Sequence, residues 1–140
     1  MNWKKLALVM LIGGLALSAA AAEYYAGKPS KRKKIAALAF MKKASSRDMR
    51  NLCRRNCGSV GDRDLRSMCR NNCGSMSNRD GRNLCRNSCG SIGNRDLRNF
   101  CRGNCGSIRN RDLRNFCRGN CGSISNRRLR SYCRNSCGSI

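Results

Sequence analysis

Apolar and polar positions recur along most of this chain in one pattern that repeats every sixteen residues. The pattern fills residues 45–140 with six copies and no insertion or deletion. The copies begin at Ser45, Gly61, Ser77, Gly93, Arg109 and Ser125. A fixed short period is typical of repeat proteins, in which each copy supplies one structural unit and packs on its neighbours.

The fifth copy, residues 109–124, has the apolar spacing of an α-helix. Its stripe at i, i+3, i+4 and i+8 consists of Leu113, Phe116, Cys117 and Cys121. Asn110 precedes the stripe and is a favourable N-cap, while Gly122 follows it where a left-handed C-cap favours glycine. Each copy is therefore predicted to form a helix of about ten residues followed by a turn.

Two departures from the pattern bear on the core. Gly81 stands where the other copies have leucine or methionine, so the helix of the third copy is expected to be the weakest. Phe100, Phe116 and Tyr132 occupy a position that is leucine or methionine in the first three copies. This substitution pattern indicates a core position and not a platform for stacking nucleic-acid bases.

The predicted core is thin for a folded array. Apart from its cysteines, the fifth copy offers Leu113, Phe116 and Ile124 as large apolar side chains. Burial of so few side chains does not offset the entropy of ordering sixteen residues, so cross-links are needed. The predicted disulfide cysteines are Cys53, Cys57, Cys69, Cys73, Cys85, Cys89, Cys101, Cys105, Cys117, Cys121, Cys133 and Cys137.

Two pairing schemes fit the repeated C-x-x-x-C spacing, because two cysteines four apart on one helix point the same way and must bond neighbouring copies. A nested scheme on antiparallel helices pairs Cys53–Cys73 and Cys57–Cys69, Cys85–Cys105 and Cys89–Cys101, and Cys117–Cys137 and Cys121–Cys133. A ladder scheme pairs Cys57–Cys69, Cys73–Cys85, Cys89–Cys101, Cys105–Cys117 and Cys121–Cys133. The nested scheme is expected, since the ladder leaves Cys53 and Cys137 over.

The paired C-x-x-x-C motifs, such as Cys117, Cys121, Cys133 and Cys137, resemble those of the α-hairpinins, which are small basic plant defence peptides. They are also similar to the small chaperones of the mitochondrial intermembrane space. The resemblance covers the cysteine spacing alone and implies helical hairpins stapled by two nested disulfides. It also implies, for the first family, an antimicrobial role.

Metal binding is the alternative use of the cysteines. The motif resembles that of exported copper-storage proteins, and thiolates favour Cu(I). The chain has no histidine, which excludes mixed Cys/His zinc sites. Because disulfides are the expected state, no metal or other cofactor is predicted.

The residues needed for common catalytic sites are missing. Without histidine, neither a Ser-His-Asp nor a Cys-His set can be assembled. The only glutamate is Glu23, and five of the six aspartates recur at one repeat position, which indicates a structural role. A non-enzymatic protein without a small-molecule substrate is therefore expected.

The segment before the repeats has two parts. Residues 1–22 have a charged start, a short apolar run and a final Ala20-Ala21-Ala22, which predicts a secretory signal peptide and an exported, periplasmic or extracellular protein. Residues 23–44 form a basic linker with a predicted helix from Lys31 to Ala44. That helix is expected to cover the open end of the array, as terminal elements of repeat proteins do. The alternative is an amphipathic helix on an anionic membrane.

Arginine dominates the charge of the repeats. The chain has 30 basic and 7 acidic residues, a net charge of +23, which favours anionic partners. Arg111, Arg114 and Arg118 share one side of the predicted helix and should form a solvent-exposed stripe. The predicted polyanion-binding residues are Arg50, Arg66, Arg82, Arg98, Arg114 and Arg130, with Arg54, Arg70, Arg86, Arg102, Arg118 and Arg134.

The sequence as a whole predicts an all-α fold of six short helices, arranged as disulfide-stapled hairpins or a small solenoid. The favoured function is binding of anionic polymers or membrane surfaces, with nucleic acid bound irrespective of sequence. A thiol-based copper protein and a structural or partner-binding scaffold are the alternatives.

Overall fold

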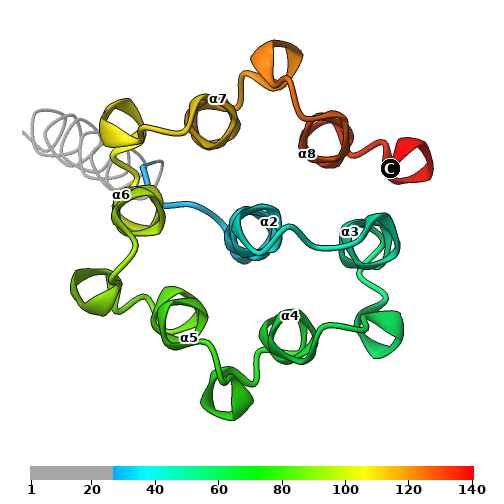
Figure 1. Cartoon of the computed structure of the whole chain (residues 1–140), viewed down its shortest axis with the longest axis horizontal. Coiled ribbons are helices and arrows are strands. Elements are labelled where there is room, and N and C mark those ends of the chain that lie inside the picture. The colour runs from blue at the N-terminus through cyan, green and yellow to red at the C-terminus, as the bar shows by residue number, and fades with distance from the viewer. Residues whose placement is uncertain (1–26) are drawn as a thin grey trace, which may run out of the picture.

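The six repeats form a closed ring of short helices around one central helix (Figure 1). The computed structural model describes residues 27–140, so the predicted signal peptide lies outside the described residues. Within residues 27–140 there are seven α-helices, six short 3₁₀ helices and no strand. The predicted all-α repeat fold is confirmed, and the repeats form a closed solenoid instead of hairpins.

The central helix is α2 (Lys31–Met41), and each copy contributes one α-helix and one 3₁₀ helix to the ring. The ring helices are α3 (Ser46–Cys53), α4 (Arg63–Cys69), α5 (Arg79–Cys85), α6 (Arg95–Arg102), α7 (Arg111–Arg118) and α8 (Arg127–Cys133). The 3₁₀ helices are η1 (Cys57–Ser59), η2 (Cys73–Ser75), η3 (Cys89–Ser91), η4 (Cys105–Ser107), η5 (Cys121–Ser123) and η6 (Cys137–Ser139). The 3₁₀ helices lie on the outside of the ring, between successive α-helices (Figure 1).

Each ring helix begins as the sequence predicts but ends earlier. The side chain of Asn110 accepts a hydrogen bond from the backbone N–H of Leu113 at 2.9 Å, which caps α7. The helix stops at Gly119, which has a left-handed φ of 78°, so α7 has eight residues. The prediction that Gly122 ends the helix is wrong, because Gly122 lies within η5. Cys117 and Cys121 are therefore not on one helix.

The left-handed position recurs in every copy. Gly103 and Gly119 occupy it in the fourth and fifth copies, and Asn71, Asn87 and Asn135 occupy it in three others. Glycine and asparagine tolerate this conformation better than other residues, so they end the helix here. The first copy has Arg55, with φ 61°, at the same position.

The apolar side chains of the repeats meet inside the ring. The predicted core residues of the fifth copy are buried, with exposed fractions of 0% for Leu113, 2% for Phe116 and 1% for Ile124. Phe116 stacks on Phe100 with ring centroids 6.0 Å apart and meets Tyr132 edge-on at 6.4 Å. The prediction that this aromatic position is a core position is confirmed.

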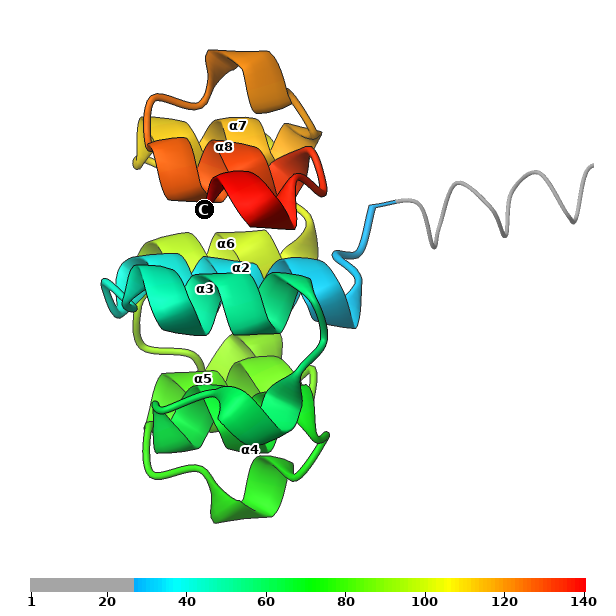
Figure 2. The same ribbon diagram turned by 90° about the vertical axis from the view of Figure 1, so that its right-hand side faces the viewer.

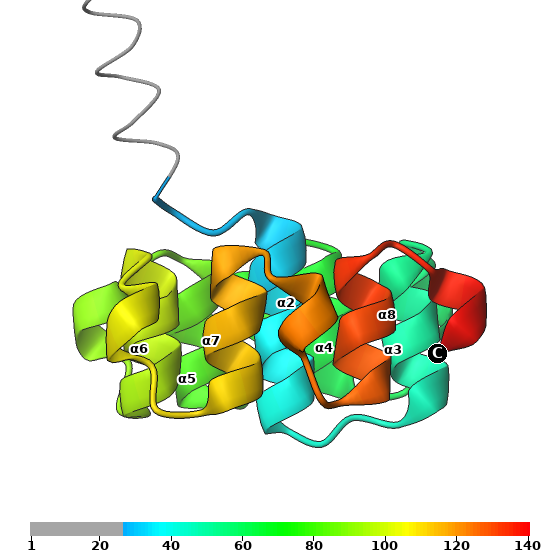
Figure 3. The ribbon, with the colours of Figure 1, turned by 90° about the horizontal axis from the view of Figure 1, so that it is seen from above.

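The ring helices are parallel to one another. The carboxylate of Asp64, in the first turn of α4, accepts hydrogen bonds from the backbone N–H groups of Ser77 and Asn78 at 2.6 and 3.1 Å. These two amides lie just before α5, so the N-termini of α4 and α5 are neighbours. Seen from the side, the ring helices lie alongside one another with their ends at two common faces (Figures 2 and 3).

All twelve cysteines form disulfides, and the pairing is the ladder with its ends joined. The bonds are Cys57–Cys69, Cys73–Cys85, Cys89–Cys101, Cys105–Cys117, Cys121–Cys133 and Cys53–Cys137. The nested scheme is wrong, because it needs both cysteines of a copy on one helix and antiparallel neighbours. Cys53 and Cys137, left over in an open ladder, meet because the last copy returns to the first.

The central helix is buried on all sides. The residues from Ile35 to Ala39 have exposed fractions of at most 6%, although they span more than one helical turn. The helix packs on α3, α4, α5, α6 and α8. It does not cover an open end of the array as expected, and it has no free apolar side to lay on a membrane.

Polar contacts at both ends fix the central helix antiparallel to the ring helices. Near its start, Lys34 donates to the side chain of Asn87, which follows α5. After its end, Lys42 lies 2.8 Å from the carboxylate of Asp62, the N-cap of α4. Lys42 also donates a hydrogen bond to the carboxylate of Asp64. Burial alone would raise the pKa of Asp64, but the hydrogen bonds from Ser77 and Lys42 outweigh the effect of burial, so the pKa of Asp64 is lowered.

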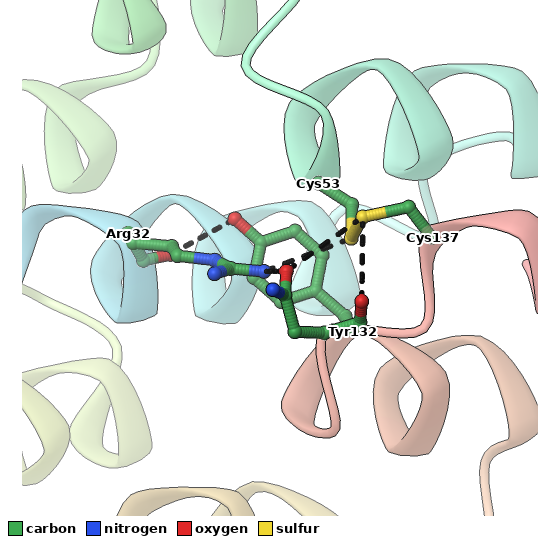
Figure 4. The surroundings of a disulfide bond; sticks show 5 residues. Arg32, Cys53, Tyr132 and Cys137 are labelled. Atoms are coloured by element: carbon green, nitrogen blue, oxygen red, sulfur yellow. Dashed lines mark hydrogen bonds between the residues drawn. A yellow bond between two sulfur atoms is a disulfide. The ribbon is translucent and has the colours of Figure 1, made fainter.

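Residues that differ from the repeat pattern help to close the seam between the last copy and the first (Figure 4). Tyr132, in place of phenylalanine, donates from its hydroxyl to the backbone oxygen of Arg32 at 3.3 Å. The Arg32 guanidinium lies 5.0 Å from the Tyr132 ring centroid and donates to the side chain of Asn135. Arg128, where other copies have aspartate, donates to the backbone oxygen of Ala44 at 2.7 Å.

Gly81 is explained by the central helix. A Cβ atom at this position would lie 2.9 Å from Cδ2 of Leu38 and 2.8 Å from Cε of Met76. Leu38 thus occupies the space that a leucine of the repeat pattern would fill. The glycine provides a notch that holds α2 against α5.

Removing the disulfide at the seam is expected to destabilise the protein more than removing one of the disulfides that join successive copies. Replacing Cys53 and Cys137 by serine removes a cross-link between residues 84 apart and should lower the free energy of unfolding by roughly 4 kcal/mol. Replacing Cys89 and Cys101, which are 12 apart, should lower it by roughly 3 kcal/mol. Amide hydrogen exchange should rise mainly in α3 and α8 in the first variant. Unchanged exchange there would contradict ring closure.

Restoring the repeat pattern at position 81 is expected to destabilise the fold. Gly81→Leu should lower stability by about 1–3 kcal/mol, measured by denaturant unfolding, because the new side chain competes with Leu38. Adding Leu38→Ala should recover part of that loss, although Leu38→Ala alone is destabilising. Additive losses in the double variant would show that the two side chains do not share this space.

Candidate polyanion-binding surface

The three arginines of each repeat lie at three different levels of the ring. In the fifth copy Arg111 is the first residue of α7, Arg114 lies in its middle and Arg118 is its last residue. Because the ring helices are parallel, the equivalents of each arginine form a circle at one level. The predicted single stripe is therefore divided between two opposite faces and the wall between them.

The middle arginines hold neighbouring copies together. Arg114 is half-buried and donates from Nη1 to the backbone oxygen of Ile108 in the preceding copy at 2.8 Å. The equivalent bonds join Arg66 to Val60, Arg82 to Met76, Arg98 to Ile92 and Arg130 to Ile124 at 2.7–3.0 Å, and Arg50 to Ile140 across the seam at 2.6 Å. The prediction that these six guanidinium groups lie free in solvent is wrong.

The arginines at the helix ends are exposed. They are Arg54, Arg70, Arg86, Arg102, Arg118 and Arg134. The Arg118 guanidinium lies across the preceding copy, with Nη2 3.8 Å from where a Cβ on Gly106 would be. Within residues 27–140 no hydrogen bond or ion pair occupies these six guanidinium groups, so they remain available to a partner.

The start of the central helix adds further cations to the same face. Lys31, Arg32, Lys33 and Lys34 lie there because α2 runs antiparallel to the ring. Lys33 donates to the backbone oxygen of Cys117, near the end of α7, at 3.5 Å. The negative ends of the helix dipoles favour cations at this level. These cations were predicted to belong to a capping segment, and their place beside the arginines of the repeats was not expected from the sequence.

We call this surface the basic face. It comprises Lys31, Arg32, Lys33, Arg54, Arg55, Arg70, Arg86, Arg102, Arg118 and Arg134, and Lys34 is buried beneath it. Arg55, in place of the usual glycine or asparagine, is also exposed.

The aspartates of the described chain all lie on the opposite face. Each sits in or just before the first turn of a ring helix, and they are Asp48, Asp62, Asp64, Asp80, Asp96 and Asp112. Five of them bind the start of the next copy, as Asp112 does through the N–H groups of Ser125 and Asn126 at 2.7 and 2.8 Å. Since this structural task ties the acidic groups to the helix starts, the basic face carries no carboxylate from residues 27–140.

Positive charges lie close together near the start of α2. Burial lowers the pKa of Lys34, and the charge of Lys28 lowers it further. Like charges therefore lie close enough to repel one another at this face.

The cysteines cannot act as thiolate ligands in this state. All twelve sulfur atoms are paired, so no thiolate is left for Cu(I). Within residues 27–140, no group of His, Cys, Asp or Glu side chains is placed so that it could hold a metal ion. The predicted disulfide state is confirmed.

Comparisons with protein-family models, with curated proteins and with solved structures found no match. The likeness to α-hairpinins in cysteine spacing does not extend to the fold, because neighbouring helices here are parallel and their disulfides are not nested. Among the helices of residues 27–140, none has the length and apolar character needed to cross a membrane.

Mutation of a middle arginine should affect stability more than mutation of an arginine at a helix end. Arg114→Gln should lower the free energy of unfolding by about 1.5–3 kcal/mol, because a charged hydrogen bond to the preceding copy is lost. Arg118→Gln, which removes the same charge from an exposed position, should change stability by less than about 0.5 kcal/mol. Equal effects in thermal and denaturant unfolding would contradict the structural role of Arg114.

Proposed function

We propose that this protein is an exported, non-enzymatic protein that binds anionic polymers or anionic surfaces through its basic face. The observation that carries the proposal is an unequal balance of charge: exposed arginines circle both faces, but the described aspartates all lie on the face opposite the basic face and offset only the charge there. Arginine grips phosphate and carboxylate through paired hydrogen bonds, and such a surface attracts polyanions over long distances.

The form of the basic face favours partners that are extended or flat. Its cations are spread around the ring and across its centre, where α2 lies (Figure 1) and where its first turn contributes Lys31 and Lys33. Contacts at several separated points suit a chain of phosphates, an acidic polysaccharide or an anionic bilayer. They provide no helix for reading a DNA groove, so binding should not depend on nucleic-acid sequence.

The disulfides support an oxidising location. Six intrachain disulfides are typical of exported proteins, since cytosolic thiols are kept reduced. We infer that the chain acts in the periplasm or outside the cell, where lipopolysaccharide, phospholipid and acidic polysaccharide are the available polyanions. An antimicrobial role is one consequence of such binding.

The two alternative functions make different demands. A copper-binding protein needs reduced thiols, whereas all the sulfurs here are paired. A scaffold whose charge serves only to keep it soluble does not need more uncompensated charge on one face than on the other. The paired sulfurs therefore weigh against copper binding, and the unequal charge of the faces favours polyanion binding over a scaffold.

A comparison of two fourfold variants tests the proposal. Changing Arg70, Arg86, Arg102 and Arg118 to glutamine removes four charges from the basic face. Changing Arg63, Arg79, Arg95 and Arg111 removes four exposed charges from the opposite face. Binding of a short random-sequence DNA duplex should weaken mainly in the first variant, and the slope of log K against log salt should fall by about 3–4 for that variant.

Anionic vesicles serve as the second probe in the same experiment, and both variants must keep the wild-type unfolding midpoint. A wild type without salt-sensitive affinity for DNA or vesicles would disprove polyanion binding. Equal weakening by the two variants would disprove the assignment to the basic face and leave only an effect of net charge.

A further inference from the structure

A cavity opens on the basic face beside the seam of the ring. It has a volume of about 310 Å³ and lies between the start of α2, the end of α3 and parts of α4 and α8. This volume is at the lower end of the range of small-molecule sites. The repeat pattern alone would not produce it, because several of its lining residues come from α2 or are specific to one copy.

The lining has an apolar part and a cationic part. The apolar part consists of Ile35, Leu52 and the Tyr132 ring, with Cys57 and Cys69 beside them. The cationic part consists of Lys31, Arg32 and Arg55. None of the residues from the described part of the chain that line the cavity is acidic, so these walls offer an anionic ligand no opposing charge.

Arg55 departs from the repeat in a way that involves backbone strain. It adopts a left-handed φ of 61°, at a position where five other copies have glycine or asparagine. A non-glycine residue in this region is disfavoured, and such strain concentrates at functional sites. Here the departure places an additional exposed cation beside the cavity.

Arg32 is already held, while Lys31 and Arg55 are available. The guanidinium of Arg32 packs over Tyr132 and donates to Asn135 and toward the Cys53 sulfur at 3.7 Å (Figure 4). These contacts fix one positive charge above the apolar part. Lys31 and Arg55 are exposed and make no side-chain hydrogen bond or ion pair within residues 27–140.

We propose that this cavity binds an amphiphilic anion, a phosphate or carboxylate group carried on a short apolar chain. The anionic group would bind Lys31 and Arg55, and the chain would lie against Ile35, Leu52 and Tyr132. The ligand is a single small molecule or the end of a lipid. This site does not depend on polyanion binding by the rest of the basic face.

The test uses alkyl phosphates of increasing chain length with the disulfide-bonded protein, by calorimetry at constant ionic strength and below micelle formation. Inorganic phosphate and octanol should each bind much more weakly than octyl phosphate. Affinity should rise roughly four-fold per methylene until the cavity is filled, and then level off. Vesicles with and without a phosphate-bearing anionic lipid distinguish a membrane source from a free ligand.

Arg55→Asn is the informative variant, because asparagine occupies this left-handed position in three copies and should preserve the fold. It should weaken octyl phosphate binding at least ten-fold. Arg118→Gln, which removes one charge from the same face away from the cavity, should weaken it less than two-fold. Resonances of Ile35, Leu52 and Tyr132 should shift on binding to the wild type.

Octyl phosphate that binds no tighter than inorganic phosphate, or equally to both variants, would disprove the site. If that happens while DNA binding remains salt-sensitive, only this inference fails and the proposed function stands. If octyl phosphate binds saturably and the protein has no affinity for polyanions, the proposed function fails and the cavity site stands.

Discussion

The burial of α2 is the constraint on which the structure depends. A copy of the repeat presents three apolar side chains to one side and cannot cover them alone, so six copies must share a common interior. The central helix fills that interior with alanines and with Leu38, which are small enough for ring helices to approach from several directions. The position of Gly81, the basic start of α2 and the Lys42 contacts all serve to hold this one helix in place.

Closure of the ring has a second effect, which concerns charge. Because the ring helices are parallel, equivalent side chains of the six copies lie at the same level. Each position of the repeat therefore forms a circle of similar side chains around the ring. Because the aspartates are needed at the helix starts to bind the next copy, the acidic side chains of residues 27–140 are confined to one face. The opposite face is left with arginines and with the cations of α2. The difference in charge between the two faces of the ring therefore follows from the way in which neighbouring copies are joined.

Much of one repeat could be predicted from the sequence, but its last turn could not. The N-cap Asn110 and the core positions Leu113 and Phe116 are set by local chemistry and by periodicity. The helix end was misplaced because Gly119 and Gly122 are both good terminators, and the choice between them determines the disulfide pairing. The recurring asparagine or glycine at the position of Gly119 was the available signal.

The sequence of α2 also indicated its interior location, since a helix that is apolar on all sides is typically buried. No single copy encodes ring closure, because the rotation between copies depends on packing. For the same reason, the roles of Arg114 and Arg118 could not be separated by spacing, as both lie on the same side of one helix.

Joining the last copy to the first has a consequence for how such a protein can evolve. An open solenoid can gain or lose one unit, because its ends are free and each unit contacts only its neighbours. In this ring, a duplication or deletion would separate Cys53 from Cys137, shift Arg128 from Ala44 and change the diameter around α2. The number of units is therefore fixed by the central helix, and variation should occur through substitutions within the units.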